Sequence, residues 1–245
     1  DYNFVCCRCS SNPCTNGATC LESANPGNYT IPYHAYSCIC VAGFREGVCE
    51  YDFNELIPGL NSSCHVMLGG NCDVDVDECS SSPCQNGATC LESSMDNAIP
   101  HHAYSCRCVD GFANGVCPHS RVPAFAEQCV VHLGGHCDVD VDECSSFPCV
   151  NGGICSDSTR NSSIPYDQYS CTCLPGFANG WCQYDYIAEY EDQCLFSLGG
   201  HCDVDVNECD SFPCQNGATC FEAVHNYTCD CVFGWDGRNC ETIID

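Results

Sequence analysis

The sequence predicts a linear array of small, disulfide-rich modules that consist mostly of β hairpins. Of the 245 residues, 32 are cysteine, and 30 of these cysteines follow one repeated pattern. The spacing C-x4-C-x5-C-x15-C-x-C-x8-C-x11-C-x7-C begins at Cys79 and again at Cys144, and a further repeat starts at Cys209, which gives a period of 65 residues. So strict a period is typical of modules that are each stapled by their own disulfides, and not of a single globule with one core.

The chain divides into an N-terminal segment and four modules. The segment covers residues 1–8, and the modules cover residues 9–72, 73–137, 138–202 and 203–245. Module 1 shows the pattern with two changes of length, and module 4 has six of its cysteines. Modules this small cannot bury enough apolar surface to fold on a core alone. Disulfides replace that core, and each contributes roughly 2–4 kcal/mol by restricting the unfolded chain.

Composition restricts the location and the partners of the protein. So many cysteines indicate an extracellular protein, secreted or on a cell surface, because cytosolic thiols stay reduced. The spacing does not match zinc knuckles. There are 33 acidic and six basic residues, for a net charge of −27, which argues against nucleic acid or an anionic membrane as the main partner. Divalent cations fit such a chain better. No apolar run approaches the length of a membrane span.

The last module carries a family signature. It ends Cys231-Val-Phe-Gly234-Trp235-Asp-Gly237-Arg-Asn-Cys240, which resembles the closing segment of an EGF-like domain, and the resemblance extends over most of the chain. It implies that cysteines one and three, two and four, and five and six are paired. In module 4 these pairs would be Cys209–Cys220, Cys214–Cys229 and Cys231–Cys240.

The first three modules depart from the family because they have eight cysteines each, and two pairings are open. In a laminin-like pairing, Cys108–Cys117 closes first and Cys129–Cys137 forms an extra loop. In a nested pairing, Cys108–Cys137 encloses an excursion closed by Cys117–Cys129. We favour the nested pairing, because removing residues 113–132 restores the spacing of module 4. Its equivalents would be Cys40–Cys72 with Cys49–Cys64, and Cys173–Cys202 with Cys182–Cys194.

Secondary structure is expected to be short. Hairpin strands are predicted at Ser37–Ile39 and Tyr104–Arg107, with a turn at Asn86-Gly87. The segment inside the extra loop of modules 1–3, here called the insert, favours a short helix, because Tyr184, Ile187, Ala188 and Tyr190 have helical spacing in module 3.

Three acidic linkers precede modules 2, 3 and 4. Linker 2 (residues 73–78), linker 3 (138–143) and linker 4 (203–208) have Asp-Val-Asp-Val before the last two residues, which are Asp-Glu or Asn-Glu and precede a first cysteine. Calcium prefers six to eight hard oxygen ligands. The linkers resemble the start of calcium-binding EGF domains, which implies a ligand pair in each linker and a third ligand two residues after the third cysteine. The implied ligands are Asp75, Glu78 and Glu92; Asp140, Glu143 and Asp157; and Asp205, Glu208 and Glu222.

Two further features of the modules follow from the resemblance. Family members have an aromatic residue two positions before the fourth cysteine that packs against the neighbouring module, and this chain has Tyr104, Tyr169 and Tyr227 there. Module 1 is preceded by Val5-Cys6-Cys7-Arg8 and not by an acidic linker, so we expect no calcium there.

Glycosylation signals are dense. Four sequons for N-linked glycans place attached sugars at Asn28, Asn61, Asn161 and Asn226. Two patterns specific to EGF-like domains also occur. C-x-S-x-P-C places O-glucose-type sites at Ser11, Ser81, Ser146 and Ser211, and C-x4-T-C places O-fucose-type sites at Thr19, Thr89 and Thr219. The alternative is that these serines and threonines only suit tight loops.

For function, the sequence favours a structural protein over an enzyme, since it has no nucleophile elbow and no H-E-x-x-H motif. The repeats resemble those of heterokont and other algal surface proteins, including mastigoneme components, which implies a subunit of a filament or surface layer that contacts copies of itself or other filament subunits. We expect lateral contacts from the inserts, because Tyr51, Phe53, Tyr184, Tyr186, Ile187 and Tyr190 have no core in which to bury. The alternative is a receptor or adhesion ectodomain that binds a protein partner.

Overall fold

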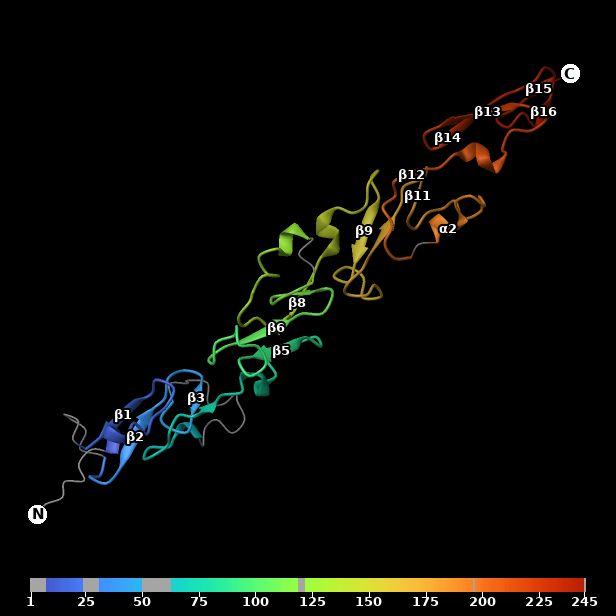
Figure 1. The fold of residues 1–245 in the computed structure, drawn as a ribbon. Coiled ribbons are helices and arrows are strands. Elements are labelled where there is room, and N and C mark those ends of the chain that lie inside the picture. Colours follow the sequence, from blue (N-terminus) through green and yellow to red (C-terminus); the bar gives the residue numbers. More distant parts are fainter. Residues whose placement is uncertain (1–7, 24–30, 50–62, 119–121, 196, 245) are drawn as a thin grey trace, which may run out of the picture. The chain divides into compact units, whose positions relative to one another are not determined.

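The computed structural model describes residues 8–23, 31–49, 63–118, 122–195 and 197–244. All strands in this part of the chain form two-stranded sheets, as Figure 1 shows. Two compact units result: one contains module 1 and most of module 2, and the other contains modules 3 and 4 with Asp110–Phe112 and the second insert. Among the described residues, no helix has the length and apolar character that a membrane crossing requires.

Each module is built on one main hairpin. The four hairpins pair β1 (Thr19–Glu22) with β2 (Tyr36–Ile39), β5 (Thr89–Glu92) with β6 (Tyr104–Arg107), β9 (Ile154–Asp157) with β10 (Tyr169–Thr172), and β13 (Thr219–Ala223) with β14 (Asn226–Asp230). The third and fourth cysteines of a module lie opposite each other in the register, as Cys90 and Cys106 do. Both predicted strands are confirmed, and β2 begins one residue earlier than predicted.

A smaller hairpin closes each module. Strands β3 (Phe44–Arg45), β7 (Phe112–Ala113) and β11 (Phe177–Ala178) pair with β4 (Val74–Asp75), β8 (Val139–Asp140) and β12 (Val204–Asp205), while β15 (Trp235–Asp236) pairs with β16 (Thr242–Ile243). The acidic linkers therefore form the last strand of the module before them. The central valines Val76, Val141 and Val206 are almost completely buried, which explains the alternation of aspartate and valine.

A short 3-10 helix opens each module: η1 (Arg8–Ser11), η2 (Glu78–Ser81), η4 (Glu143–Ser146) and η5 (Glu208–Ser211). The third Asp or Asn of each linker caps the following helix. Asp77 accepts a hydrogen bond from the Ser80 amide at 2.8 Å, and Asp142 accepts one from the Ser145 amide at 3.0 Å. Asn207 caps η5 through the Cys209 amide at 3.1 Å. Short polar side chains are preferred at this position because they satisfy free amides.

The nested disulfide pairing is confirmed. Module 2 contains Cys108–Cys137 around Cys117–Cys129, and modules 1 and 3 contain the equivalent bonds Cys40–Cys72, Cys49–Cys64, Cys173–Cys202 and Cys182–Cys194. Module 4 has the three pairs that the EGF-like resemblance implies. Cys6 and Cys7 lie outside the described residues.

The inserts differ from the predicted helix. In module 3 the α-helix is α2 (Glu191–Cys194), whereas Tyr184 to Tyr190 form consecutive turns. The spacing of the apolar residues correctly predicted that they lie on one side of the segment. Contacts of that side with linker 4, described below, hold the segment in turns and not in a helix. In module 2 the insert contains the 3-10 helix η3 (Pro123–Phe125), which lies beside η4. Most of the module 1 insert, including Tyr51 and Phe53, lies outside the described residues.

Candidate metal sites at the acidic linkers

The first disulfide of each module brings the third predicted ligand to the linker. In module 3, Cys144–Cys155 has a Cα separation of 5.7 Å, and the amide of Cys144 donates to Asp157 Oδ2 at 3.3 Å. The same bond, from the amide of the first cysteine to the carboxylate two residues after the third cysteine, joins Cys79 to Glu92 at 3.4 Å, Cys209 to Glu222 at 3.3 Å and Cys9 to Glu22 at 3.0 Å. The longer glutamate therefore reaches the position that aspartate occupies in module 3.

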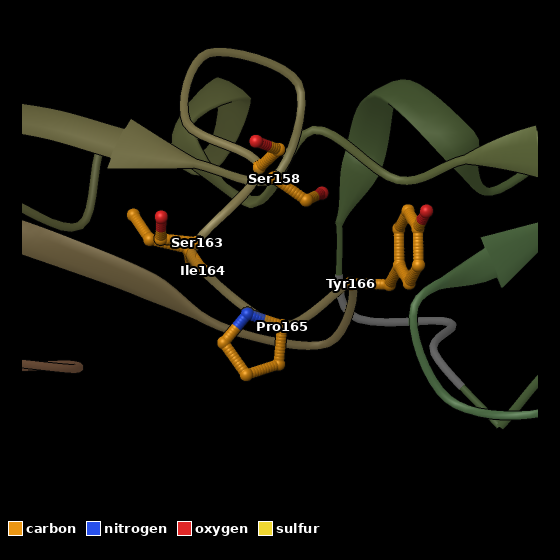
Figure 2. Close-up of a pocket in the computed structure, with 6 residues that line it drawn as sticks. Ser158, Ser163, Ile164, Pro165 and Tyr166 are labelled. Atoms are coloured by element: carbon orange, nitrogen blue, oxygen red, sulfur yellow. The ribbon is translucent and has the colours of Figure 1, made fainter.

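Linker 3 leaves carboxylate oxygens without partners. Asp140 Oδ2 accepts a hydrogen bond from the Ser158 hydroxyl at 2.8 Å, but Asp140 Oδ1 and Glu143 Oε2 are buried atoms without a hydrogen-bond partner among the described residues. Asp157 is completely buried, and its Oδ1 accepts a hydrogen bond from Thr159 at 2.5 Å. Figure 2 shows Ser158, the donor to Asp140, on the same loop as Tyr166. Buried oxygens normally have partners, so these orphaned atoms fit a hard cation such as calcium.

The electrostatics of linker 3 support this fit. Burial raises the pKa of Glu143 to about 7, and the nearby carboxylates of Asp157 and Asp140 add to the increase. Acidic side chains with raised pKa values repel one another in their charged form, and a divalent cation would relieve that repulsion. The charged form of Glu143 is therefore the one that a bound cation would stabilise.

An arginine also approaches this site. Arg160 Nη2 lies 3.5 Å from Asp142 Oδ2, and Nη1 lies 3.8 Å from Asp157 Oδ2. Carboxylates of Asp142 and Asp157 and the sulfur of Cys144 lie within 4.8 Å of one another, but Cys144 is bonded to Cys155 and offers no thiolate. Asp142 Oδ1 is occupied by the cap of η4, whereas Asp140 and Glu143 each keep a buried oxygen without a hydrogen-bond partner among the described residues.

Linker 2 resembles linker 3, except that both carboxylate oxygens of Asp75 have a partner in module 2. Asp75 Oδ2 accepts a hydrogen bond from Ser93 at 2.6 Å, and Asp75 Oδ1 lies 3.1 Å from His101 Nδ1. Glu78 and Glu92 are buried, and Glu92 Oε1 accepts a hydrogen bond from Ser94 at 2.6 Å. Asp75 and Glu92 thus both bond to the loop that follows β5, Asp75 through Ser93 and Glu92 through Ser94.

Linker 4 differs from the other two. Asp205 and Glu222 are exposed, whereas Glu208 is buried and accepts a hydrogen bond from the Tyr184 hydroxyl at 3.1 Å. Burial raises the pKa of Glu208 to about 7, with a further contribution from Glu222. Glu208 Oε2 is buried without a hydrogen-bond partner among the described residues. A side chain of the module 3 insert thus takes part in a site that sequence reasoning assigned to the linker and module 4.

The ring and hydrogen-bond contacts of the three tyrosines lie within their own modules. Tyr104 and Tyr169 pair with His136 and His201 of their own modules, and Tyr227 donates to Asn239 of its own module at 2.7 Å. The residues that join modules come instead from the closing hairpins and the loops after the first main strand. Phe44 packs on His101 with ring centroids 4.8 Å apart, and Phe112 packs on Tyr166 at 4.9 Å.

A glycine before each of these closing hairpins permits the contact. Gly176 has φ +94°, and a Cβ built there would lie 2.8 Å from Cβ of His225 in module 4. Gly43 and Gly111 meet the backbone of His101 and Tyr166 in the same way, whereas Gly234 in the last module has the same φ and no atom within 4 Å. At each joint the glycine of this glycine-aromatic pair therefore permits the next module to approach closely, and at the first two joints the aromatic residue packs on that module.

The predicted exposure of the insert side chains is wrong for module 3. Tyr184, Ile187 and Tyr190 are 5%, 3% and 7% exposed, and they form a buried cluster with Ala178, Cys194 and Val206. Only Tyr186 follows the prediction, at 70% exposed. The apolar side chains have a core after all, because the insert covers the linker that follows its own module.

The predicted glycosylation sites lie on the surface or near it. Asn161 and Asn226 are exposed, whereas Asn28 and Asn61 lie outside the described residues. Thr19, Thr89 and Thr219 are exposed at the first position of their strands. Ser11, Ser81, Ser146 and Ser211 end the 3-10 helices, and each hydroxyl donates to the carbonyl three residues earlier at 2.8–2.9 Å.

Comparisons with known proteins agree with this architecture. The sequence profile of the EGF-like domain matches residues 9–47, 79–114 and 209–239. The chain is similar to mouse EGF-like repeat and discoidin I-like domain-containing protein 3, with 32% identity over 150 residues, 61% of this chain and 24% of that protein. It is 30% identical over 255 positions to zebrafish protein eyes shut homolog, which covers 97% of this chain and 7% of that protein.

Bovine adhesion G protein-coupled receptor E5 is 27% identical over 157 residues, 63% of this chain and 18% of that protein. The chain thus spans about a quarter or less of the length of these relatives. The disulfide pairs, the repeated hairpins and the matched segments lead to the same conclusion: the chain contains tandem EGF-like domains.

Proposed function

We propose that this chain is a structural array of EGF-like modules outside the cell, and that linkers 2, 3 and 4 bind calcium. The observation that carries this proposal is a pair of buried oxygens in linker 3, Asp140 Oδ1 and Glu143 Oε2, for which the described part of the chain offers no hydrogen-bond partner. They lie on the linker that the first disulfide brings beside Asp157. Six or more oxygens around calcium would come from these carboxylates, loop carbonyls and water.

Calcium would act on the joints between modules. Each linker is a strand of the preceding module and continues into the first 3-10 helix of the next. A cation held by Asp140, Glu143 and Asp157 would tie these two parts together and offset the repulsion between the carboxylates. In linker 2, Asp75, Glu78 and Glu92 would do the same, and in linker 4 Asp205, Glu208 and Glu222. Since module 1 follows Arg8 instead of an acidic linker, we propose no calcium there.

Isothermal titration with calcium at pH 7.5, followed by a crystal structure with calcium supplied, tests this proposal. The expected result is three bound ions, with density at Asp140, Glu143 and Asp157. An ordered structure in saturating calcium without an ion at linker 3 would contradict it.

For the larger assembly, we propose a subunit of an extracellular filament or surface layer, of the kind that algal EGF-repeat proteins form. The 65-residue repeat supports this proposal, because equivalent modules offer equivalent contacts along an array. Lateral contacts through the module 3 insert are no longer part of it, since Tyr184, Ile187 and Tyr190 are buried. Negative-stain images of native material should show filaments or sheets, and isolated particles at all concentrations would contradict assembly.

The second candidate is a receptor or adhesion ectodomain that binds a protein. The similarity to an adhesion G protein-coupled receptor supports it. The proposed glycans are compatible with either function. Intact-mass and glycopeptide mass spectrometry of the native protein would test the sites at Asn161, Asn226 and the O-glycan positions. Isolated particles that bind a cell surface would favour the ectodomain over the filament.

A further inference from the structure

The module 3 insert makes two hydrogen bonds to the linker that follows. The Tyr184 hydroxyl donates to Glu208 Oε1 at 3.1 Å, and the Asn207 amide donates to Tyr190 Oη at 3.0 Å. The Gly176 amide donates to Tyr184 Oη at 2.9 Å, so this hydroxyl connects the closing segment of module 3 to the first helix of module 4. His225 Nδ1 also lies 3.4 Å from Tyr184 Oη. Asn207 and Glu208, the two residues of linker 4 that the insert contacts in this way, are therefore each hydrogen-bonded to a tyrosine hydroxyl.

Apolar packing supports these bonds. Tyr184, Ile187 and Tyr190 are buried in one cluster with Val206, the completely buried valine of linker 4. Cys194 belongs to the same cluster, and its bond to Cys182 fixes both ends of the insert. Burial of these three large side chains against Val206 removes their apolar surface from water, which holds the insert on linker 4. No part of this arrangement requires a metal ion.

We propose that the module 3 insert is a strap that fixes linker 4 in the absence of calcium and thereby positions the Glu208 carboxylate. Tyr184 engages Oε1, which leaves Oε2 as the free oxygen of that carboxylate. Tyr184 is a positioning residue in this scheme. The consequence for calcium rests on the function proposed above, whereas the strap itself does not.

Amide hydrogen exchange of the full chain in EDTA tests the strap. In Tyr184→Phe the Gly176 amide loses its acceptor, and in Tyr190→Phe the Asn207 amide loses its acceptor. Exchange at the affected amide should rise about fivefold in each variant and further in the double variant, as expected for one net hydrogen bond of about 1 kcal/mol. Tyr186→Phe is the matched control, because Tyr186 belongs to the same insert but is exposed.

The outcomes separate the strap from general damage. Amides of the hairpin β13–β14 report the fold of module 4, and they should keep their protection in every variant. Unchanged exchange at Gly176 and Asn207 in the double variant, or an equal change in Tyr186→Phe, would overturn the strap.

Calcium titration tests the positioning of Glu208. In a chain with Glu78→Gln and Glu143→Gln, linker 4 is the remaining calcium site of the proposal. Adding Tyr184→Phe should weaken binding there about tenfold, as is typical when a group that orients a ligand is lost. Unchanged affinity would overturn the positioning role but leave the strap to the exchange experiment. If the chain with an intact Tyr184 binds no calcium at linker 4, the proposed function fails at that linker, and exchange in EDTA still decides the strap.

Discussion

Linkers 3 and 4 have nearly the same sequence, but the structure uses them differently. Among the described residues, Asp140 and Glu143 of linker 3 each retain a buried oxygen without a hydrogen-bond partner, and Glu208 of linker 4 retains one as well. In linker 4 the insert supplies Tyr184 to Glu208 and packs around Val206, while Asp205 is exposed. The difference comes from the inserts: Tyr184 has its counterpart in His119 of module 2, which supplies no phenol. If both linkers bind calcium as proposed, we therefore expect the two joints to depend on it to different degrees.

The largest expected effect comes from a substitution in the proposed calcium site of linker 3. Glu143→Gln removes the charge of a ligand but keeps its shape, and calcium binding at linker 3 should weaken about a hundredfold, because a hard cation depends on its charged ligands. Titration calorimetry should then show one ion fewer at micromolar to low millimolar calcium. Glu189→Gln, the same change at an exposed glutamate of the module 3 insert, is the matched control and should leave all sites as they are. Equal titrations of wild type and Glu143→Gln would contradict the assignment.

The glycine contact at the joints should have the next largest effect. The Val206 amide donates to the Gly176 carbonyl at 2.8 Å, and the Ile244 amide donates to the Gly234 carbonyl at 2.9 Å. Gly176→Ala introduces a positive-φ residue and a clash with His225, whereas Gly234→Ala introduces the same backbone strain alone. Exchange of the Val206 amide should rise about thirtyfold in the first variant, and exchange of Ile244 about fivefold in the second, since strain of this kind costs of order 1 kcal/mol and a clash adds to it.

Those two variants separate strain from docking. Similar increases at Val206 and Ile244 would mean that backbone strain explains the whole effect and that the contact between modules 3 and 4 contributes little.

The raised pKa of Glu143, about 7, makes calcium binding at linker 3 sensitive to pH. A folded-state pKa above the ordinary value means that the free protein holds a proton that calcium must displace. Apparent affinity should therefore be constant well above pH 7 and fall as the pH drops, by about tenfold per pH unit for one proton. Without calcium the sign is opposite: stability from the protonated carboxyl is lost as the pH rises from the unfolded pKa towards 7.

Titrations at several pH values between 5.5 and 8 would measure this dependence. In Glu143→Gln the residual binding at linker 3 should lose the slope near pH 7. A calcium affinity at linker 3 that stays constant from pH 8 to pH 6 would contradict the raised pKa.

Sequence reasoning predicted the parts of the fold that local spacing controls. The EGF-like resemblance implied the disulfide pairs of module 4 and the place of Asp157 beside linker 3, and spacing favoured the nested pairing over the laminin-like one in modules 1–3. Each of these features lies within one module, where a disulfide fixes nearby residues. The structure departs from the expectations where contacts join modules. Nothing in the spacing of Tyr184 and Tyr190 shows that they pack on Val206, and the same one-sided pattern would suit an exposed patch. Ser158 and Phe112 likewise acquire roles only through neighbours that are distant in the sequence.

The smallest expected effect concerns Arg160, which distinguishes linker 3 from linker 2, where Met95 has the equivalent position. Its guanidinium lies 3.8 Å from Asp157 Oδ2 and competes with a cation for that carboxylate. Because the side chain is half exposed, the ion pair is worth no more than about 1 kcal/mol. Arg160→Met should therefore raise calcium affinity at linker 3 about two- to fivefold in low salt, with a smaller gain in 0.5 M NaCl. The reverse change, Met95→Arg, should weaken linker 2 by a similar factor. If both variants shift affinity in the same direction, the arginine acts through folding and not through competition for Asp157.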